Sequence, residues 1–99
     1  MLDVEKFKPE FTELCRRLNV SRLDLFGSAT SDDFRADSDV DVLVQFAPDG
    51  EDFFNRYFDL LEGLEVIVGR PVDLVMEDSL RNPYFKAAVE RTRKTVYAG

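Results

Sequence analysis

The chain has 99 residues, of which 44% are hydrophobic and 33% are charged, and its formal net charge at pH 7 is −7. This composition is typical of a folded globular protein, and no apolar run approaches the roughly 20 residues of a transmembrane helix. The acidic balance disfavours sequence-independent attraction to nucleic acid or to anionic lipid. We therefore expect a single domain spanning residues 1–99, located in the cytoplasm, with no membrane contact and no direct nucleic-acid binding.

The chain contains no histidine and one cysteine, Cys15. The absence of histidine excludes serine-histidine triads, zinc-histidine sites and histidine acid-base chemistry. Cys15 has no second cysteine for a disulfide and no histidine to activate it, so we interpret it as a packed helical residue and not as a nucleophile. Carboxylates are therefore the main chemical resource of this sequence.

The apolar pattern predicts helices and strands that alternate at short spacing. Pro9 suits a first helical position, and Asn19 and Gly69 can each end a helix in the left-handed conformation. Asn82 and Pro83 form an N-cap and first-turn pair. In chain order, the predicted elements are a helix over 9–18, a strand over 22–26, a helical turn over 29–33, a strand over 40–46, a helix over 53–68, a strand over 72–76, a helix over 83–93, and residues 95–97 as a last strand or a segment against the sheet.

Two of the predicted strands determine the fold class. Residues 40–46 are almost continuously apolar, as in a strand buried on both faces of a sheet, and residues 48–50 follow with turn chemistry. Residues 72–76 form a second apolar strand after Pro71, a residue that is tolerated at the start or the edge of a sheet. The order predicts an α/β fold in which helices layer against a sheet, with an acidic site at the strand ends.

Asp39 and Asp41 lead into the strand at 40–46. Residues two apart on a strand point to the same face about 6.6 Å apart, so these carboxylates should lie side by side while Val40 and Val42 face the core. Carboxylates that close repel one another unless one takes up a proton or a cation sits between them. The alternative, a solvated acidic turn, does not explain why aliphatic residues flank Asp41. A divalent metal ion explains the pattern better.

Asp73 is the candidate for a third carboxylate. It lies inside the apolar strand at 72–76, where an unpaired aspartate would be costly, so we expect it to bind metal or to act as a general base toward an attacking hydroxyl. Mg²⁺ combines one or two carboxylates with water and substrate phosphates. Two such ions could hold both the attacking and the leaving oxygen of a phosphoryl or nucleotidyl transfer.

Gly27 and Ser28 follow the strand at 22–26. A glycine lets the backbone turn tightly, and its main-chain amides, together with the Ser28 hydroxyl, can hold phosphate oxygens. A Gly-Ser pair alone is a weak signal. Placed shortly before the acidic motif, it is a candidate phosphate-binding turn.

Taken together, Gly27-Ser28, ten intervening residues, Asp39-x-Asp41 and the later Asp73 resemble the G-S-x10-D-x-D signature of the DNA polymerase beta-like nucleotidyltransferase superfamily. The segments LFGSATSDDFRADSDVDVLVQF, GRPVDLVM and RNPYFKAAVERTRKTVYA are similar to the minimal nucleotidyltransferases known as MNT or MntA proteins. This resemblance covers nearly the whole chain.

The resemblance implies a palm-like mixed β-sheet with flanking helices, and a reaction in which nucleotide passes from Mg-ATP to a hydroxyl. By position, Asp39, Asp41 and Asp73 would be the catalytic and metal-binding triad for two Mg²⁺ ions, and Gly27 and Ser28 would bind the triphosphate. Many such minimal proteins are antitoxins that neutralise a HEPN-domain ribonuclease toxin, often by adding AMP to one of its tyrosines. We accordingly expect a hetero-oligomer with a HEPN toxin.

Two other functions stay open. An antitoxin could block its toxin by binding alone, with a vestigial nucleotide site. A nucleotidyltransferase acting on a small molecule is less favoured, because the chain is too small to add a domain that recognises an antibiotic or a tRNA end.

Ser31 departs from the family pattern. Members often carry an arginine three residues after the serine, where this chain has Ser31. If that arginine holds phosphates, we expect nucleotide affinity or activity to be reduced here.

Several further residues have two interpretations. Arg70 could reach a nucleotide phosphate, although a solvated or carboxylate-paired arginine is favoured. Asp32 and Asp33 are interpreted as a solvated or capping turn and not as metal ligands. Aromatic residues in two groups fit either ordinary packing or a partner surface, and at least one member of the first group cannot face the core. The groups are Phe53, Phe54, Tyr57 and Phe58, and then Tyr84 and Phe85.

Overall fold

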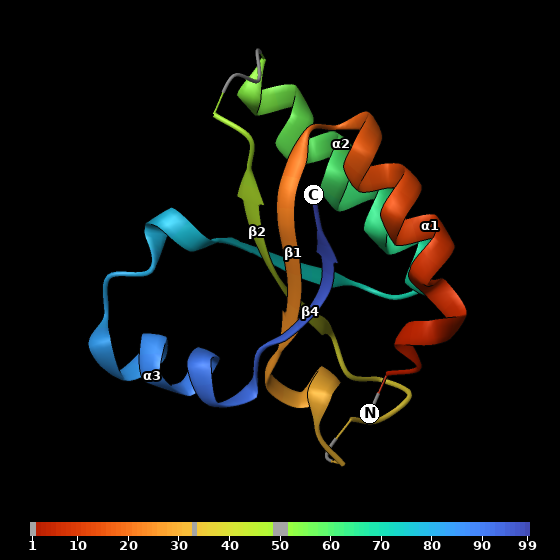
Figure 1. Cartoon of the computed structure of the whole chain (residues 1–99). Coiled ribbons are helices and arrows are strands. Elements are labelled where there is room, and N and C mark those ends of the chain that lie inside the picture. The colour runs from red at the N-terminus through yellow and green to blue at the C-terminus, as the bar shows by residue number, and fades with distance from the viewer. Residues whose placement is uncertain (1, 33, 49–51) are drawn as a thin grey trace.

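The chain forms a four-stranded mixed β-sheet with helices on both of its faces (Figure 1). The computed structural model describes residues 2–32, 34–48 and 52–99. The elements are helices α1 (Val4–Arg17), α2 (Phe53–Val68) and α3 (Pro83–Thr92), strands β1 (Val20–Phe26), β2 (Val40–Phe46), β3 (Val72–Met76) and β4 (Lys94–Ala98), and the short 3-10 turns η1 (Gly27–Thr30) and η2 (Glu77–Ser79). The predicted α/β fold is confirmed.

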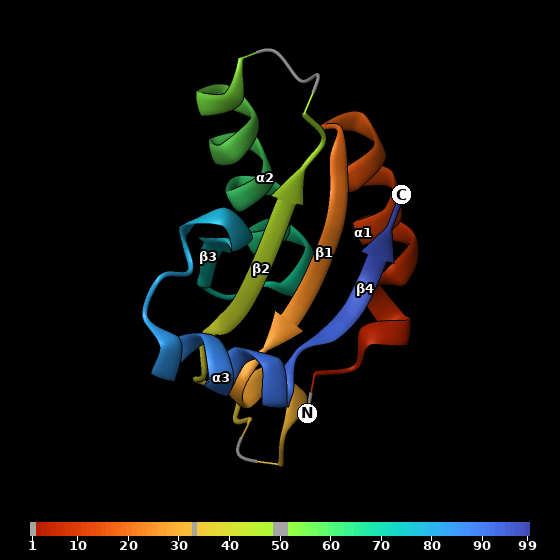
Figure 2. The same cartoon turned by 60° about the vertical axis from the view of Figure 1, so that its left-hand side comes forward.

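The strands lie in the order β3-β2-β1-β4. β1 is antiparallel to both β2 and β4, whereas β2 and β3 are parallel, since α2 carries the chain back across one face between them. The end of β1 and the beginning of β2, which lie toward the bottom of Figure 2, therefore meet the beginning of β3 at one end of the sheet.

Alternate residues of β2 contribute to the core on opposite faces of the sheet. Val40, Val42 and Val44 belong to the main hydrophobic cluster, which includes buried residues of α1 and α2. Leu43 belongs to a smaller cluster on the other face, with Phe26 and with Val89 of α3. The prediction that this strand is buried on both faces is confirmed, and Figure 2 shows α3 in front of the sheet with α1 and α2 behind it.

The first helix is longer than predicted. It begins at Val4 and not at Pro9, because the Asp3 carboxylate accepts a hydrogen bond from the Lys6 N–H at 3.4 Å and caps the helix there. Pro9 lies inside the helix at an exposed position, where water can solvate the Glu5 carbonyl that the missing N–H leaves unpaired.

The other predicted helix ends agree with the structure. Asn19 and Gly69 both adopt the left-handed conformation, with φ of 55° and 69°. Asn82 caps α3, because its side-chain oxygen accepts hydrogen bonds from the N–H groups of Tyr84 and Phe85.

The strand and turn predictions had mixed outcomes. The bounds of β2 and β3 are the predicted ones, β1 begins two residues earlier than predicted, and the last segment forms β4. The helical turn predicted over 29–33 is instead the 3-10 turn η1, which begins earlier, at Gly27. Asp33, and residues 49 and 50 of the turn predicted over 48–50, lie outside the described residues.

The sequence predicts neither a membrane-spanning helix nor a reactive cysteine. In the part of the chain that the structure describes, no helix is both long and apolar enough to cross a bilayer. Cys15 is buried in α1, and burial raises the pKa of its thiol to about 12. A thiol that stays protonated is inert, so Cys15 packs in the core as predicted.

Candidate active site

Asp41 and Asp73 lie side by side on neighbouring strands. They are register partners in the parallel pair of β2 and β3, so their side chains leave the same face of the sheet, the one that α3 partly covers. Asp39 precedes Asp41 by two residues and lies just before β2 begins at Val40. Asp41 is half-buried, whereas Asp39 and Asp73 are exposed. The three predicted carboxylates thus meet at one end of the sheet.

Asp73 is exposed at the edge of the sheet. The apolar strand around it predicts that an unpaired aspartate is costly there, but β3 is an edge strand and Asp73 is exposed. That reason is wrong. Asp73 is singled out instead by its register with Asp41.

The three carboxylates influence one another electrostatically. Burial raises the pKa of the Asp41 carboxyl, and the neighbouring charges of Asp73 and Asp39 raise it further. Asp41 is therefore destabilised as an anion unless a cation offsets the negative charge around it. A hard divalent cation such as Mg²⁺ suits this set of oxygen donors.

The carboxylates alone would not complete a metal site. Among the described residues, no three His, Cys, Asp or Glu side chains are arranged closely enough to hold a metal ion together. Mg²⁺ usually takes one or two carboxylates from the protein and the rest of its ligands from water and substrate phosphates. The arrangement fits that open kind of site, in which Asp41 and its neighbours supply part of the coordination.

Gly27 follows β1 and approaches Asp41 closely. Its φ is +66°, and a Cβ at this position would lie 2.6 Å from Asp41 Oδ2, closer than real Cβ contacts. The N–H of Gly27 donates to Thr92 Oγ1 at 2.9 Å, so this amide already has a partner. Glycine is thus favoured here by its conformation and its lack of a side chain, and its role in binding phosphate stays a prediction.

Ser28 and Ser31 shape the turn η1. The N–H and the hydroxyl of Ser31 both donate to the Ser28 carbonyl, at 3.0 and 3.2 Å. That the Ser28 hydroxyl holds phosphate stays a prediction. Asp32, next in the chain, is exposed, as expected for a solvated turn. That Ser31 reduces nucleotide affinity stays a prediction.

Arg70 contacts main-chain oxygens. Its Nη1 donates to the carbonyls of Arg35 at 2.8 Å and Ser38 at 3.3 Å, and its guanidinium carbon lies 4.6 Å from the centroid of the Phe34 ring. Arg70 is half-buried, and its hydrogen bonds to other described residues go to main-chain carbonyls and not to a carboxylate. Arg70 instead holds the loop that leads to Asp39.

Asp24 is a buried acid that the sequence argument missed. It is fully buried on β1 beneath the end of α3, where Arg93 Nε donates to its Oδ2 at 2.6 Å and Arg22 Nε to its Oδ1 at 3.1 Å. Arg93 also donates to Glu77 and to Glu90, each at 2.7 Å. Burial lowers the pKa of Arg93, but these three carboxylate partners outweigh burial and raise it. Asp24 is therefore a structural residue that fixes α3 on the sheet.

The aromatic residues divide between packing and exposure. Tyr57 donates its hydroxyl to the Leu74 carbonyl at 2.8 Å, and Phe53 packs edge-on against Phe46. Phe54 is 70% exposed and Tyr84 is 86% exposed. The prediction that at least one residue of the first group cannot face the core is confirmed.

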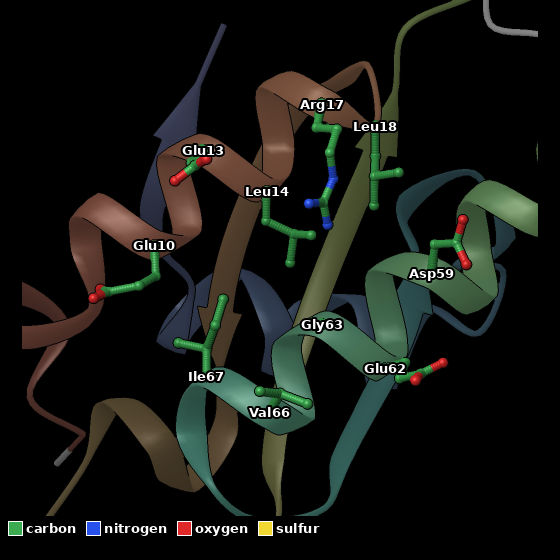
Figure 3. Close-up of a pocket in the computed structure, with 10 residues that line it drawn as sticks. All are labelled: Glu10, Glu13, Leu14, Arg17, Leu18, Asp59, Glu62, Gly63, Val66 and Ile67. Atoms are coloured by element: carbon green, nitrogen blue, oxygen red, sulfur yellow. The ribbon is translucent and has the colours of Figure 1, made fainter.

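A groove between α1 and α2 is separate from the carboxylates. It has a volume of about 530 Å³, and Figure 3 shows its lining on both helices, with Arg17 reaching from α1 toward α2. None of the candidate site residues lines it. Because α1 and α2 cover the face of the sheet opposite Asp41, this groove is not part of the candidate active site.

Comparison with known proteins gives the class of the chain. The nucleotidyltransferase domain family matches residues 8–96, and the chain therefore belongs to that family. The protein adenylyltransferase MntA of Thermococcus cleftensis is 35% identical over 101 residues, which cover 98% of this chain and 97% of that protein. The chain is thus an MntA-like, minimal nucleotidyltransferase in sequence.

Solved structures agree with this assignment. The structure of a candidate minimal nucleotidyltransferase has a TM-score of 0.74 and 30% identity, and the match covers 95% of this chain and 96% of that one. A tri-AMPylated HEPN toxin of Shewanella oneidensis in complex with its MNT antitoxin contains a chain with a TM-score of 0.65 and 19% identity, covering 97% of this chain and 73% of that one. At that identity the second likeness shows a shared fold.

Proposed function

We propose that this protein is a Mg²⁺-dependent antitoxin that transfers AMP from ATP to a tyrosine hydroxyl of a cognate HEPN ribonuclease toxin and thereby neutralises it. The observation that carries the proposal is the register of Asp41 with Asp73, with Gly27 packed against the Asp41 carboxylate. The similarity over almost its whole length to a protein adenylyltransferase supports the reaction type.

The site residues would divide the work of AMP transfer among them. The toxin hydroxyl oxygen attacks the α-phosphorus of ATP, the bond from that phosphorus to the bridging oxygen breaks, and pyrophosphate leaves. Asp73 is exposed at the edge of the sheet and accepts the proton of the attacking hydroxyl or binds metal. Asp39 and Asp41 would hold two Mg²⁺ ions, which neutralise the charge that develops on the phosphate oxygens. Ser28 holds the triphosphate beside Gly27.

The proposal extends to the setting of the protein. We expect it to act as a single domain over residues 1–99, in the cytoplasm, and in a hetero-oligomer with the toxin. A solved complex of an MNT antitoxin with an AMPylated HEPN toxin supports that kind of partner. ATP is the expected nucleotide, and the net charge of −7 disfavours direct binding to RNA.

Toxin co-expression tests this function in cells. We expect the wild-type protein to restore growth and the Asp39→Asn, Asp41→Asn double variant to fail, because the double variant cannot bind Mg²⁺. The matched control is Asp32→Asn with Asp37→Asn, which removes the same charge from two exposed residues of the same loop. We expect this control to restore growth as the wild type does.

A second function stays open, an antitoxin that inhibits by binding alone and has a vestigial nucleotide site. This function predicts that the Asp39→Asn, Asp41→Asn variant still restores growth. Growth with that variant would therefore reject the catalytic proposal in favour of binding.

A further inference from the structure

The residues just before Asp39 form a closed turn. The N–H of Ser38 donates to the Arg35 carbonyl at 3.0 Å, and the N–H of Arg35 donates to Ser38 Oγ at 3.0 Å. Asp39 follows this turn directly and precedes the first residue of β2, Val40. The Asp39 side chain is exposed, so packing of this side chain does not hold the residue in position.

Arg70 connects this turn to the beginning of β3. It is half-buried, and its Nη1 donates to the carbonyls of both residues that close the turn, Arg35 at 2.8 Å and Ser38 at 3.3 Å. Its guanidinium also lies over the ring of Phe34, 4.6 Å from the centroid. Stacking on one side and hydrogen bonds to two carbonyls hold the planar guanidinium in one orientation.

The residue after Arg70 holds the other side of Asp39. The carbonyl of Pro71 accepts a hydrogen bond from the Val40 N–H at 3.0 Å, the first contact between β2 and the segment that becomes β3. Adjacent residues 70 and 71 therefore anchor the residues on both sides of Asp39, the Ser38 carbonyl and the Val40 amide.

We propose that Arg70 is a positioning residue that keeps the Asp39 carboxylate beside Asp41, ready to share a divalent cation. The inference rests on the proposed function, which makes Asp39 and Asp41 metal ligands. A carboxylate on an unanchored loop would have to be ordered when the metal binds, and that ordering weakens affinity. With Arg70 and Pro71 in place, the main chain around Asp39 is already ordered.

The inference differs from a direct contact between Arg70 and a nucleotide phosphate. If Arg70 contacts phosphate directly, replacing it should mainly lower the affinity for ATP. If Arg70 positions Asp39, replacing it should lower the affinity for the metal ion. Residues that orient metal ligands typically change metal affinity about 10- to 100-fold when they are replaced. Metal binding measured apart from catalysis separates the two roles.

Mn²⁺ is the probe, titrated into the purified chain both without nucleotide and with the α,β-methylene analogue of ATP, and followed by electron paramagnetic resonance. A positioning role of Arg70 should change both affinities, whereas a direct phosphate contact should change only the one measured with the analogue. We expect Arg70→Gln to weaken Mn²⁺ binding about tenfold. Phe34→Leu, which removes the ring beneath the guanidinium, should weaken it in the same direction but less. Arg16→Gln, at an exposed arginine of α1, is the matched control and should bind Mn²⁺ as the wild type does.

A second measurement reports on the loop without metal. Hydrogen exchange at the Ser38 and Val40 amides should be faster in Arg70→Gln than in the wild type and in Arg16→Gln. Unchanged Mn²⁺ affinity in Arg70→Gln overturns the inference, whether or not the KM for ATP rises, and unchanged exchange overturns it as well. A wild-type chain that binds no Mn²⁺ contradicts the proposed function itself, and the inference falls with it.

Discussion

Gly27 and Gly69 have nearly the same backbone conformation but different surroundings. Their φ values are +66° and +69°, and a Cβ would meet Asp41 Oδ2 at 2.6 Å in Gly27 but nothing within 4 Å in Gly69. Either change to alanine should lower the free energy of unfolding by about 1–2 kcal/mol, because both residues are left-handed. Only Gly27→Ala should also displace the Asp41 carboxylate and abolish AMP transfer. Urea unfolding and toxin modification measure the two effects, and equal activity of the variants would contradict the assigned role of Gly27.

The carboxyl of Asp41 should make the metal-free protein sensitive to pH. Its pKa in the folded state is raised above the ordinary value of 3.8, so the folded chain binds this proton more tightly than the unfolded chain does. The stability that this proton contributes is complete at pH values below the pKa of the Asp41 carboxyl in the unfolded chain. It is lost as pH rises through the pKa of the same carboxyl in the folded chain. At pH 7 the ionised Asp41 therefore destabilises the metal-free fold.

Asp41→Asn tests that sign, because asparagine cannot ionise. With a chelator present, the substitution should raise the Tm at pH 7 by more than it does at pH 4, although it abolishes activity. Asp32→Asn, at an exposed residue of the same loop, should change the Tm little at either pH. Scanning calorimetry measures both, and a lower Tm for Asp41→Asn at pH 7 would contradict the electrostatic account of the site.

At the residue scale, spacing predicted the carboxylates but not their supports. Asp39, Asp41 and Asp73 follow from strand periodicity and motif spacing, and the structure brings them together. Asp24 also lies in an apolar strand. Unlike Asp41 and Asp73, it is fully buried, and it pairs with Arg93. A lone aspartate in a strand does not reveal which partner will reach it, because that partner lies far away in the sequence.

The helix α3 is fixed to the sheet by Arg93, the residue that follows it. Replacing Arg93 by methionine leaves Asp24 buried with only Arg22 as an ion-pair partner among the described residues. Removing one partner of a buried ion pair typically costs about 3–5 kcal/mol, so we expect a loss of at least about 3 kcal/mol in the free energy of unfolding. Urea unfolding measures it.

The Arg93→Met, Asp24→Asn double variant is the control for this prediction. Once Asp24 carries no charge, the loss of Arg93 should cost less, so the double variant should be more stable than the sum of the two single losses predicts. Strictly additive losses would show that the two side chains do not stabilise one another.

At the element scale, the apolar segments were predicted well and the capped helix start was not. The bounds of β2, β3 and α2 follow from runs of buried residues between turn-forming or charged residues. The start of α1 depends on one side-chain bond from Asp3, and Pro9 misled the prediction because an exposed proline can lie inside a helix. Sheet order and register depend on long-range pairing that no local pattern encodes.

The two faces of the molecule have different roles. The face that α1 and α2 cover holds the main core, whereas the face bordered by α3 carries the carboxylates. In the proposed function the toxin hydroxyl reaches Asp41 and Asp73, so we expect the toxin to cover the α3 side. The fold class could be predicted from the sequence, but this division of the faces required the pairing of the strands.

This division predicts which exposed aromatic residue contacts the toxin. Tyr84, 86% exposed on α3, should contribute, and Tyr84→Ala should weaken the toxin complex by about 1–2 kcal/mol. Phe54, 70% exposed at the start of α2, is the control, and Phe54→Ala should leave affinity unchanged. Titration calorimetry measures both, and the reverse order of effects would place the toxin on the other side of the molecule.

The intact mass of the cognate toxin, measured after incubation with Mg-ATP and this protein, tests the central claim most directly. We predict a toxin heavier by one or more AMP units on tyrosine with the wild-type chain, and an unchanged mass with Asp39→Asn, Asp41→Asn or when Mg²⁺ is chelated. An unchanged mass with the wild-type chain at saturating Mg-ATP, while the toxin is still neutralised, would contradict the account and leave binding as the mechanism of neutralisation.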